Sequence, residues 1–94
     1  MKRVYKFKVS VIGGPQTIAL PVDAKLVHSR MGDDGDVVYL WYQVDSGKLV
    51  KNHRFEIFGT GMDVPQTYQH VATVSALDLC LVWHVYELEE TFGG

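Results

Sequence analysis

Two stretches of this chain carry apolar residues on both of their alternating faces. Residues 79–88 form two apolar sets that only His84 interrupts, and residues 37–44 show the same two-sided pattern. Both runs are short for helices and rich in valine and aromatic residues, which favours β-strands. A strand that is apolar on both faces needs a neighbour on each side and cover over each face. The pattern therefore predicts two central, fully covered strands.

Five further segments alternate apolar and polar positions, as half-buried strands do. They lie at 4–11, 16–20, 24–30, 50–58 and 68–75. Glycine, proline and aspartate separate them, most clearly in the turn 32–36, and no segment shows a helical apolar stripe. The pattern predicts an all-β fold: a single-domain antiparallel β-sandwich or small barrel of about seven strands that spans residues 1–94.

The spacing of the turns also predicts two hairpins. Residues 13–15 would fold segment 4–11 back onto 16–20, and residues 75–78 would join the last two strands. In that last hairpin Val74 would lie opposite Leu79, and His70 opposite Trp83, which keeps apolar partners on a common face. The place best suited to a single helical turn is 63–67, where an aspartate could cap it.

The composition is that of an ordinary globular domain. Hydrophobic residues make up 47% of the chain and charged residues 21%, which indicates neither disorder nor a membrane span. Cys80 is the sole cysteine, so no disulfide can form within the chain, and its place in an apolar strand predicts a buried, reduced thiol. No apolar signal core follows the charged first residues. We therefore expect a cytoplasmic protein.

The charge pattern argues against a nucleic-acid partner. The net charge is −2, and the basic residues near the start of the chain are only mildly offset by acidic residues near its end. Binding to nucleic acid needs a clustered basic surface, which the order of residues along the chain does not show.

No arrangement of residues predicts catalysis or metal binding. His84 follows Cys80 by four residues, about 13 Å along a strand, which is too far for direct contact. The histidines lack the spacings of zinc sites, and the aspartates of the turn 32–36 lack the offsets of a calcium loop. We expect a protein that is not an enzyme and holds no metal or cofactor. For His84 two interpretations stay open: a hydrogen-bonded structural histidine, or a polar group at the floor of an aromatic pocket.

A binding surface is predicted around the glycine-rich turn that follows segment 50–58. Glycines let backbone N–H groups approach a partner closely, and the threonine between them adds a hydroxyl. Arginine and aromatic side chains are included because they supply most of the energy at contact surfaces. The predicted contact residues are Gly59, Thr60, Gly61, Arg54, Tyr39 and Trp41. In the alternative interpretation the turn only ends a strand and the aromatic residues pack inside.

Five tyrosines and two tryptophans exceed what so small a core comfortably encloses. Surplus aromatic residues tend to mark contact surfaces, and a dimer is the commonest closed assembly. We therefore expect a homodimer.

Several stretches of the chain resemble a family of small proteins encoded by tailed phages and prophages. They are Tyr5-Lys6, 16–21 with Ala24-Lys25, Leu40-Trp41 with Val44-Asp45, 55–61 with Pro65, and 82–87. The turn 32–36 departs from the family in being longer and more acidic, which bears on loop function and not on fold. The resemblance brings no established activity. It implies a non-virion accessory protein in the bacterial cytoplasm, in the size class of phage inhibitors of host enzymes and defence systems.

Two classes of function follow. In the first, the chain is a non-enzymatic binding protein that inhibits a host protein or defence system, or sequesters a small signalling molecule. Its partner is then a host protein or a small nucleotide-like ligand, and the structure should show a discrete pocket or one partner-sized interface. In the second, it is a structural or morphogenetic component that assembles through its β edges, and long open edges should be present.

Overall fold

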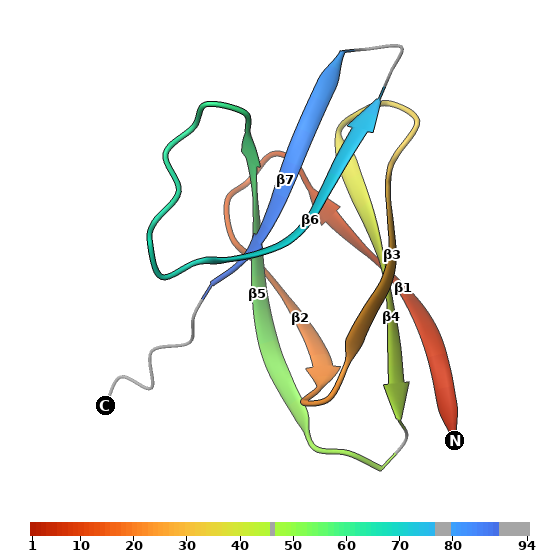
Figure 1. The fold of residues 1–94 in the computed structure, drawn as a ribbon. Coiled ribbons are helices and arrows are strands. Elements are labelled where there is room, and N and C mark those ends of the chain that lie inside the picture. Colours follow the sequence, from red (N-terminus) through yellow and green to blue (C-terminus); the bar gives the residue numbers. More distant parts are fainter. Residues whose placement is uncertain (46, 77–79, 89–94) are drawn as a thin grey trace.

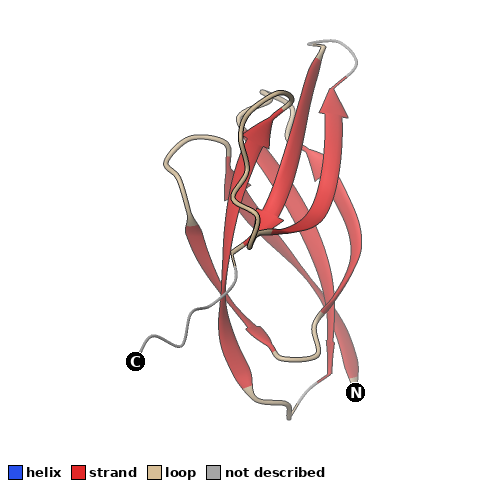
Figure 2. Cartoon of the chain, turned by 60° about the vertical axis from the view of Figure 1, so that its left-hand side comes forward, coloured by secondary structure: helices blue, strands red, loops and turns tan. Residues whose placement is uncertain are grey.

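The computed structural model describes residues 1–45, 47–76 and 80–88, and all of its regular structure in these ranges is β (Figures 1 and 2). The strands are β1 (Lys2–Ser10), β2 (Gln16–Pro21), β3 (Lys25–Met31), β4 (Val37–Asp45), β5 (Val50–Gly59), β6 (Gln69–Ala76) and β7 (Leu81–Glu87). The predicted all-β fold is confirmed. Within the described ranges no helix is long and apolar enough to cross a membrane.

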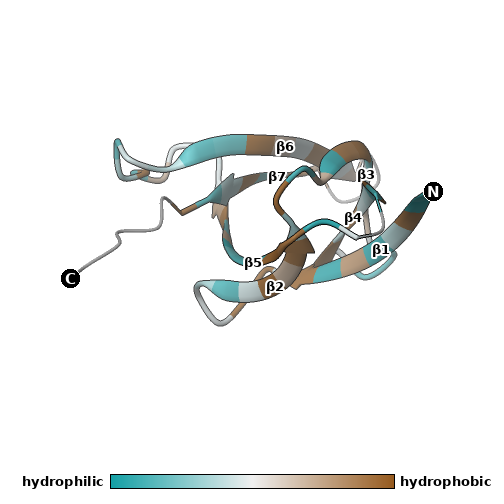
Figure 3. Ribbon diagram, turned by 90° about the horizontal axis from the view of Figure 1, so that it is seen from below, coloured by the Kyte–Doolittle hydropathy of each residue, from teal (hydrophilic) through white to brown (hydrophobic). Residues whose placement is uncertain are grey.

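The strands form two antiparallel sheets that pack as a small β-sandwich. One sheet has the order β1-β4-β3 and the other β2-β5-β7-β6. Seen from below, the sheets lie as two layers, and hydrophobic and hydrophilic positions alternate along the strands (Figure 3). Val9, Val38 and Leu40 of the first sheet and Phe55 and Val85 of the second are fully buried between them. Their alternate positions point into the core because successive side chains of a strand face opposite sides.

β4 and β7 are central strands, as their two-sided apolar pattern predicts. The prediction that both faces of these strands are fully covered is wrong. β4 buries Val38 and Leu40 on its inner face, while Tyr39 and Trp41 on its outer face are only half-buried. β7 buries Val85 but leaves Val82 38% exposed. Two layers make one core, so in the described part of the chain neither sheet has a third layer over its outer face. The connection from β5 to β6 covers only part of the outer face of the second sheet, where Tyr68 packs on Phe58.

The predicted hairpin between the first two strands is wrong. β1 pairs with β4 and β2 pairs with β5, so residues 11–15 cross from one sheet to the other. The side chain of Gln16 bridges this crossing: it accepts from the Ser10 N–H and donates to the Ser10 carbonyl, both at 2.7 Å. A side-chain amide thus binds the backbone at the end of β1, where a hairpin partner would have done so.

The second predicted hairpin exists, but its register is different. Val74 lies opposite Trp83, four residues beyond the predicted partner Leu79, and Ala76 lies opposite Leu81. At Val74 the displacement is even and keeps the residue on the same face of the sheet, so the alternation alone could not distinguish the two registers there. His70 lies opposite Tyr86 and not opposite the predicted Trp83, because the register shifts between His70 and Ala72. Residues 77 and 78 of the predicted turn lie outside the described residues, and so does Leu79.

Cys80 precedes β7 and does not belong to it. Its φ of 53° is in the left-handed region, and its side chain is exposed. The predicted buried thiol is therefore wrong. The turn into β7 extends through Cys80, and the strand itself begins at Leu81.

The turn predictions at 32–36 and 63–67 have different outcomes. Residues 32–36 connect β3 to β4 as predicted, with the Gly32 N–H donating to the Val37 carbonyl at 2.8 Å. Residues 63–67 form no helical turn, and the Tyr68 N–H donates to the Pro65 carbonyl at 3.0 Å in a tight turn.

Candidate functional site

The structure distributes the six predicted contact residues over three places. Gly59 ends β5, and Thr60 and Gly61 follow it in the connection to β6. Arg54 lies five residues earlier on β5, exposed and opposite Thr17 of β2. Tyr39 and Trp41 lie on β4, in the other sheet. The two aromatic residues therefore do not share a surface with the glycine-rich turn.

Thr60 belongs to a chain of four polar side chains on the outer face of the second sheet, which we call the threonine–histidine chain: His70, Thr73, His84 and Thr60. The Thr60 hydroxyl lies 2.9 Å from His84 Nε2, and the Thr73 hydroxyl lies 3.0 Å from His84 Nδ1. His70 Nε2 lies 2.8 Å from the same Thr73 hydroxyl. Both ring nitrogens of His84 therefore have a hydroxyl partner.

A shallow hollow of about 180 Å³ adjoins this chain. It is lined by Phe58, Gly59, Thr60, Gly61, Met62, Val64, His84 and Tyr86. The Phe58 and Tyr86 rings meet edge-on with centroids 5.6 Å apart. Both interpretations of His84 thus hold in part: it is hydrogen-bonded, and it lines an aromatic hollow.

Gly59 has a packing role in addition to its place in the turn. A Cβ atom at this position would lie 3.3 Å from the Trp83 ring, and the Gly59 N–H already donates to Met62 Sδ at 3.1 Å. The residue that the sequence predicts as a contact for a partner is thus partly occupied with its own neighbours.

The distances in the threonine–histidine chain are those of a nucleophile next to its base. The charged group that would stabilise a protonated base is not part of this chain. In such sets the base is oriented by a third group that stabilises the imidazolium charge, usually a carboxylate. Here the third group is the neutral hydroxyl of Thr73. Among the described residues, no three histidine, cysteine, aspartate or glutamate side chains are grouped so as to hold a metal ion.

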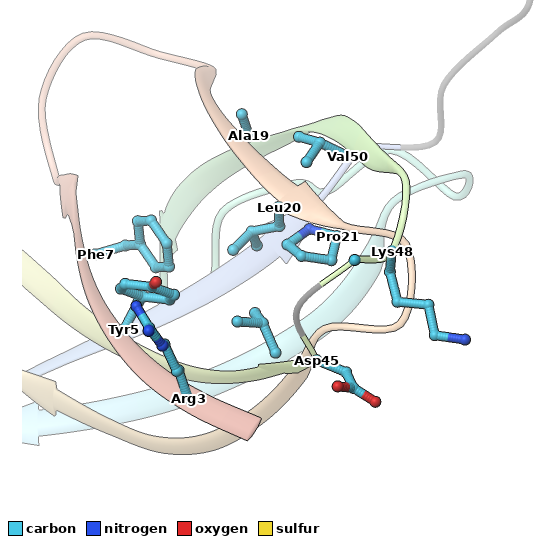
Figure 4. A pocket seen from close by; sticks show the side chains of 11 residues that line it. Arg3, Tyr5, Phe7, Ala19, Leu20, Pro21, Asp45, Lys48 and Val50 are labelled. Atoms are coloured by element: carbon cyan, nitrogen blue, oxygen red, sulfur yellow. The ribbon is translucent and has the colours of Figure 1, made fainter. Parts of the chain in front are cut away.

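A larger cavity of about 410 Å³ opens between β1 and β2 (Figure 4). It exists because the two strands are neighbours in space but belong to different sheets, so no ladder of hydrogen bonds closes the gap between them. Tyr5 and Phe7 of β1 form one wall, and Leu20 and Pro21 of β2 lie across from them. Val44 of β4 also lines the cavity.

Charged side chains lie at the rim of this cavity. Arg3 lies on one side, and Lys48 and Asp45 lie where β4 turns toward β5 (Figure 4). Asp45 Oδ1 is 3.3 Å from the N-terminal ammonium, so this carboxylate has a cation of its own. The rim therefore offers two cationic side chains above an apolar, partly aromatic interior.

Exposed apolar residues extend the cavity outward, and we call them the apolar lip: Val22, Leu49 and Val50. They are 54%, 80% and 63% exposed, respectively. The Val22 N–H donates to the Leu49 carbonyl at 2.9 Å, which ties the end of β2 to the β4–β5 connection. Apolar surface gathered at one rim is typical of a contact surface.

A polar group lies inside the sandwich, against the inner face of the second sheet. His53 Nδ1 lies 2.9 Å from Glu87 Oε2, and in the described part of the chain His53 Nε2 is buried with no hydrogen-bond partner.

Burial, with a smaller contribution from the negative charge of Glu87, raises the pKa of Tyr42 to about 12. The Tyr42 phenol thus stays neutral at any pH near neutrality.

Sequence reasoning missed the cavity. The sequence feature that could have indicated it is the apolar inner face of 4–11, because Tyr5 and Phe7 on that face must pack against side chains of another strand. The predicted hairpin with 16–20 would have placed those partners in the same sheet and left no gap.

The chain was compared with protein-family models, curated proteins and solved structures. A family model described as a domain of unknown function, DUF7352, matches residues 1–92. No curated protein and no solved structure matches the chain.

Proposed function

We propose that this chain, which belongs to the DUF7352 family, is a non-enzymatic binding protein that holds a small nucleotide-like anion in the cavity between β1 and β2. One observation carries the proposal: an apolar, partly aromatic cavity of about 410 Å³ has two cationic side chains at its rim. Binding sites for small molecules usually have volumes of roughly 300–1,000 Å³, mostly apolar walls and a few polar groups that fix orientation.

The chemistry of the lining selects the class of ligand. Tyr5 and Phe7 offer ring faces and edges to a planar ring, whose apolar area would be buried against Leu20. Arg3 and Lys48 at the rim suit a phosphate or carboxylate that stays close to water. A nucleotide has both parts, which favours sequestration of a small signalling molecule by stoichiometric binding.

The resemblance to phage-encoded proteins supplies the biological side of the proposal. An accessory protein of a phage would act in the bacterial cytoplasm and take up a ligand made by the host. A host protein is the second candidate partner, and the apolar lip favours it because Leu49 and Val50 are 80% and 63% exposed. Self-assembly through β edges is less well supported, since β1 carries Lys6 and Lys8 and Pro21 ends β2.

The test is calorimetric titration of the purified chain with a panel of mononucleotides, dinucleotides and cyclic nucleotides. The double variant Arg3→Gln/Lys48→Gln should weaken binding of the best ligand by about tenfold or more, because two charge-assisted contacts are lost. Tyr5→Ala should weaken it several-fold by removing one wall.

The control is Lys51→Gln/Arg54→Gln, which changes the charge of the chain equally and lies outside the cavity lining. It should bind like the parent chain. Loss of binding in this control alone would contradict the proposal and favour the surface around Arg54. If no member of the panel binds and a host protein is retained through Leu49, the inhibitor alternative replaces it.

A further inference from the structure

The outer face of the sheet β1-β4-β3, which we call the basic face, gathers cations from distant parts of the chain. Five of the nine lysine and arginine residues lie on it: Lys2, Lys6, Lys8, Lys25 and Arg30. Residues directly opposite each other in a sheet point to the same face. On β1, Lys6 lies opposite Trp41 and Lys8 opposite Tyr39. On β3, Arg30 also lies opposite Tyr39, so all three cations are on one face. The three strands contain one acidic residue, Asp45, which lies opposite Lys2 and 3.3 Å from the exposed N-terminal ammonium.

Two aromatic side chains occupy the middle of the basic face. Tyr39 and Trp41 are half-buried on β4, with ring centroids 6.2 Å apart. Lys6 Nζ lies 4.2 Å from the Tyr39 centroid and 5.7 Å from the Trp41 centroid. On the other side, the His28 ring centroid lies 5.0 Å from that of Trp41. Rings in the middle of the sheet are thus flanked by cationic or titratable groups on both edge strands.

The positive charge of this face is largely uncompensated. Within the described ranges, neither Lys6 nor Lys8 lies within ion-pair distance of a carboxylate. Arg30 is 3.3 Å from Asp33, but the two side chains are 64% and 93% exposed, so solvent screens that pair. The strands β1, β4 and β3 thus carry more positive than negative side chains on this face, although the net charge of the whole chain is −2.

We infer that the basic face binds single-stranded nucleic acid. Phosphates would lie along Lys6 and Lys8 on one side and Arg30 on the other, while bases stack against Trp41 and its neighbour Tyr39. A positively charged surface with aromatic side chains for stacking is how proteins bind single strands without sequence preference. A duplex keeps its bases stacked on each other, so it could use the cations but not the rings.

The order of residues along the chain does not show this cluster of cations, and the net charge of −2 conceals it. The lysines of β1 and the basic residues of β3 are about twenty residues apart, and the rings of β4 come later still. Pairing of both edge strands with β4 brings the three sets together. The basic face is also independent of the proposed cavity, since the even-numbered residues of β1 face outward and Arg3, Tyr5 and Phe7 line the cavity.

The test uses fluorescence anisotropy with labelled oligo(dT) and oligo(U) of about 15 nucleotides, a length within the usual site size of one β domain. Binding should weaken as salt rises. Lys6→Gln/Lys8→Gln should lower the affinity about tenfold or more and reduce the salt slope by roughly 1.4, which corresponds to two lost phosphate contacts. Lys51→Gln/Arg54→Gln removes the same charge from β5, which belongs to the other sheet, and should leave both values unchanged. The DNA and RNA probes decide which polymer is preferred.

A second readout reports on stacking directly. Oligonucleotide should quench tryptophan emission in the parent chain, because Trp41 lies on the basic face. Trp83 faces the core side, where its Nε1 donates to the Gly35 carbonyl at 3.1 Å, so it should not be quenched. Trp41→Phe keeps a ring for stacking and should therefore retain binding but lose the quenching.

Three results would each overturn the inference. One is equal loss of affinity in Lys6→Gln/Lys8→Gln and in Lys51→Gln/Arg54→Gln, which would indicate only net charge. Another is unchanged quenching in Trp41→Phe, which would place the strand elsewhere. The last is binding of polyglutamate or of duplex DNA as tight as that of the single strands, which would make the face a site for acidic proteins or polyanions in general.

Discussion

The Thr60 hydroxyl lies 2.9 Å from His84 Nε2, and the effect of this hydrogen bond on stability can be measured. Thr60→Ala should lower the melting temperature by only a few degrees, because an exposed hydroxyl is worth roughly 1 kcal/mol or less to folding. The His84 Nε2 resonance should nevertheless shift in nitrogen NMR spectra, since the hydroxyl 2.9 Å away is gone.

Thr17→Ala is the matched control for this substitution, because Thr17 is an exposed threonine on β2. It should leave the His84 ring unchanged. A loss of more than about 10 °C in Thr60→Ala would show that the turn 59–61 is needed for folding, and its predicted role in binding would then lose support.

Tyr42 predicts an alkaline limit to stability. Its pKa is raised from the ordinary value of 10.0 to about 12 in the folded chain. Between these values the unfolded state releases a proton that the folded state keeps, so the free energy of unfolding falls as the pH rises from 10 to 12. Two pKa units correspond to roughly 2–3 kcal/mol.

The measurement is urea unfolding of the parent chain and of Tyr42→Phe at pH 8, 10 and 11.5. Other tyrosines and lysines titrate in both proteins, so the difference between the two curves isolates Tyr42. The free energy of unfolding of the parent chain should fall relative to that of the variant above pH 10, because the variant has no phenol to ionise at this position. A constant difference across the range would contradict the raised pKa.

At the scale of elements, the turn between β3 and β4 leaves no room for a side chain at Gly32. A Cβ atom there would lie 2.5 Å from Val37 Cγ2, closer than packed atoms approach. Gly32→Ala should therefore destabilise the chain by roughly 1–3 kcal/mol.

Val37→Ala removes the clashing methyl group, so the double variant should be more stable than the sum of the two single effects implies. Thermal unfolding of the four proteins in this double-mutant cycle measures the coupling. Additive effects would show that Gly32 is required by its backbone and not by the contact with Val37.

Strand positions could be predicted from sequence, whereas strand partners could not. The alternation that places Val38, Leu40 and Val44 on one side of β4 depends only on neighbouring residues, and the bounds of β4 and β5 follow it closely. Pairing depends on contacts between residues far apart. Val74 could face Leu79 or Trp83 with the same apolar match. The hydrogen bonds of the Gln16 side chain to Ser10, at the crossing from β1 to β2, are likewise signalled by no pattern.

Because strand pairing could not be predicted, the contacts within the candidate site could not be predicted either. Thr60 and His84 lie 24 residues apart, and their contact depends on the pairing of β5 with β7. Tyr39 and Trp41 were expected near Thr60 on the strength of residue type alone. Their actual neighbours, Lys6 and His28, could be identified only after β1 and β3 were known to flank β4.

At the scale of the whole molecule, the expected homodimer can be tested on the apolar lip. Light scattering should give about twice 10.6 kDa at high concentration, and Leu49→Ser should move the mass toward the monomer by removing an 80% exposed apolar side chain. Ile12→Ser is the matched control, since Ile12 is 78% exposed in the connection from β1 to β2. A monomer mass for the parent chain would contradict the expected dimer.

The crossing from β1 to β2 has a further consequence for synthesis on the ribosome. β1 emerges first, yet its partner β4 is complete only at Asp45, and β2 must wait for β5, which ends at Gly59. β1 thus stays without its partner until Asp45 and β2 until Gly59, and closing such long loops slows folding. The charges on Lys6 and Lys8 are then useful before the native state exists, because they keep the waiting strand from pairing with another copy on the same polysome.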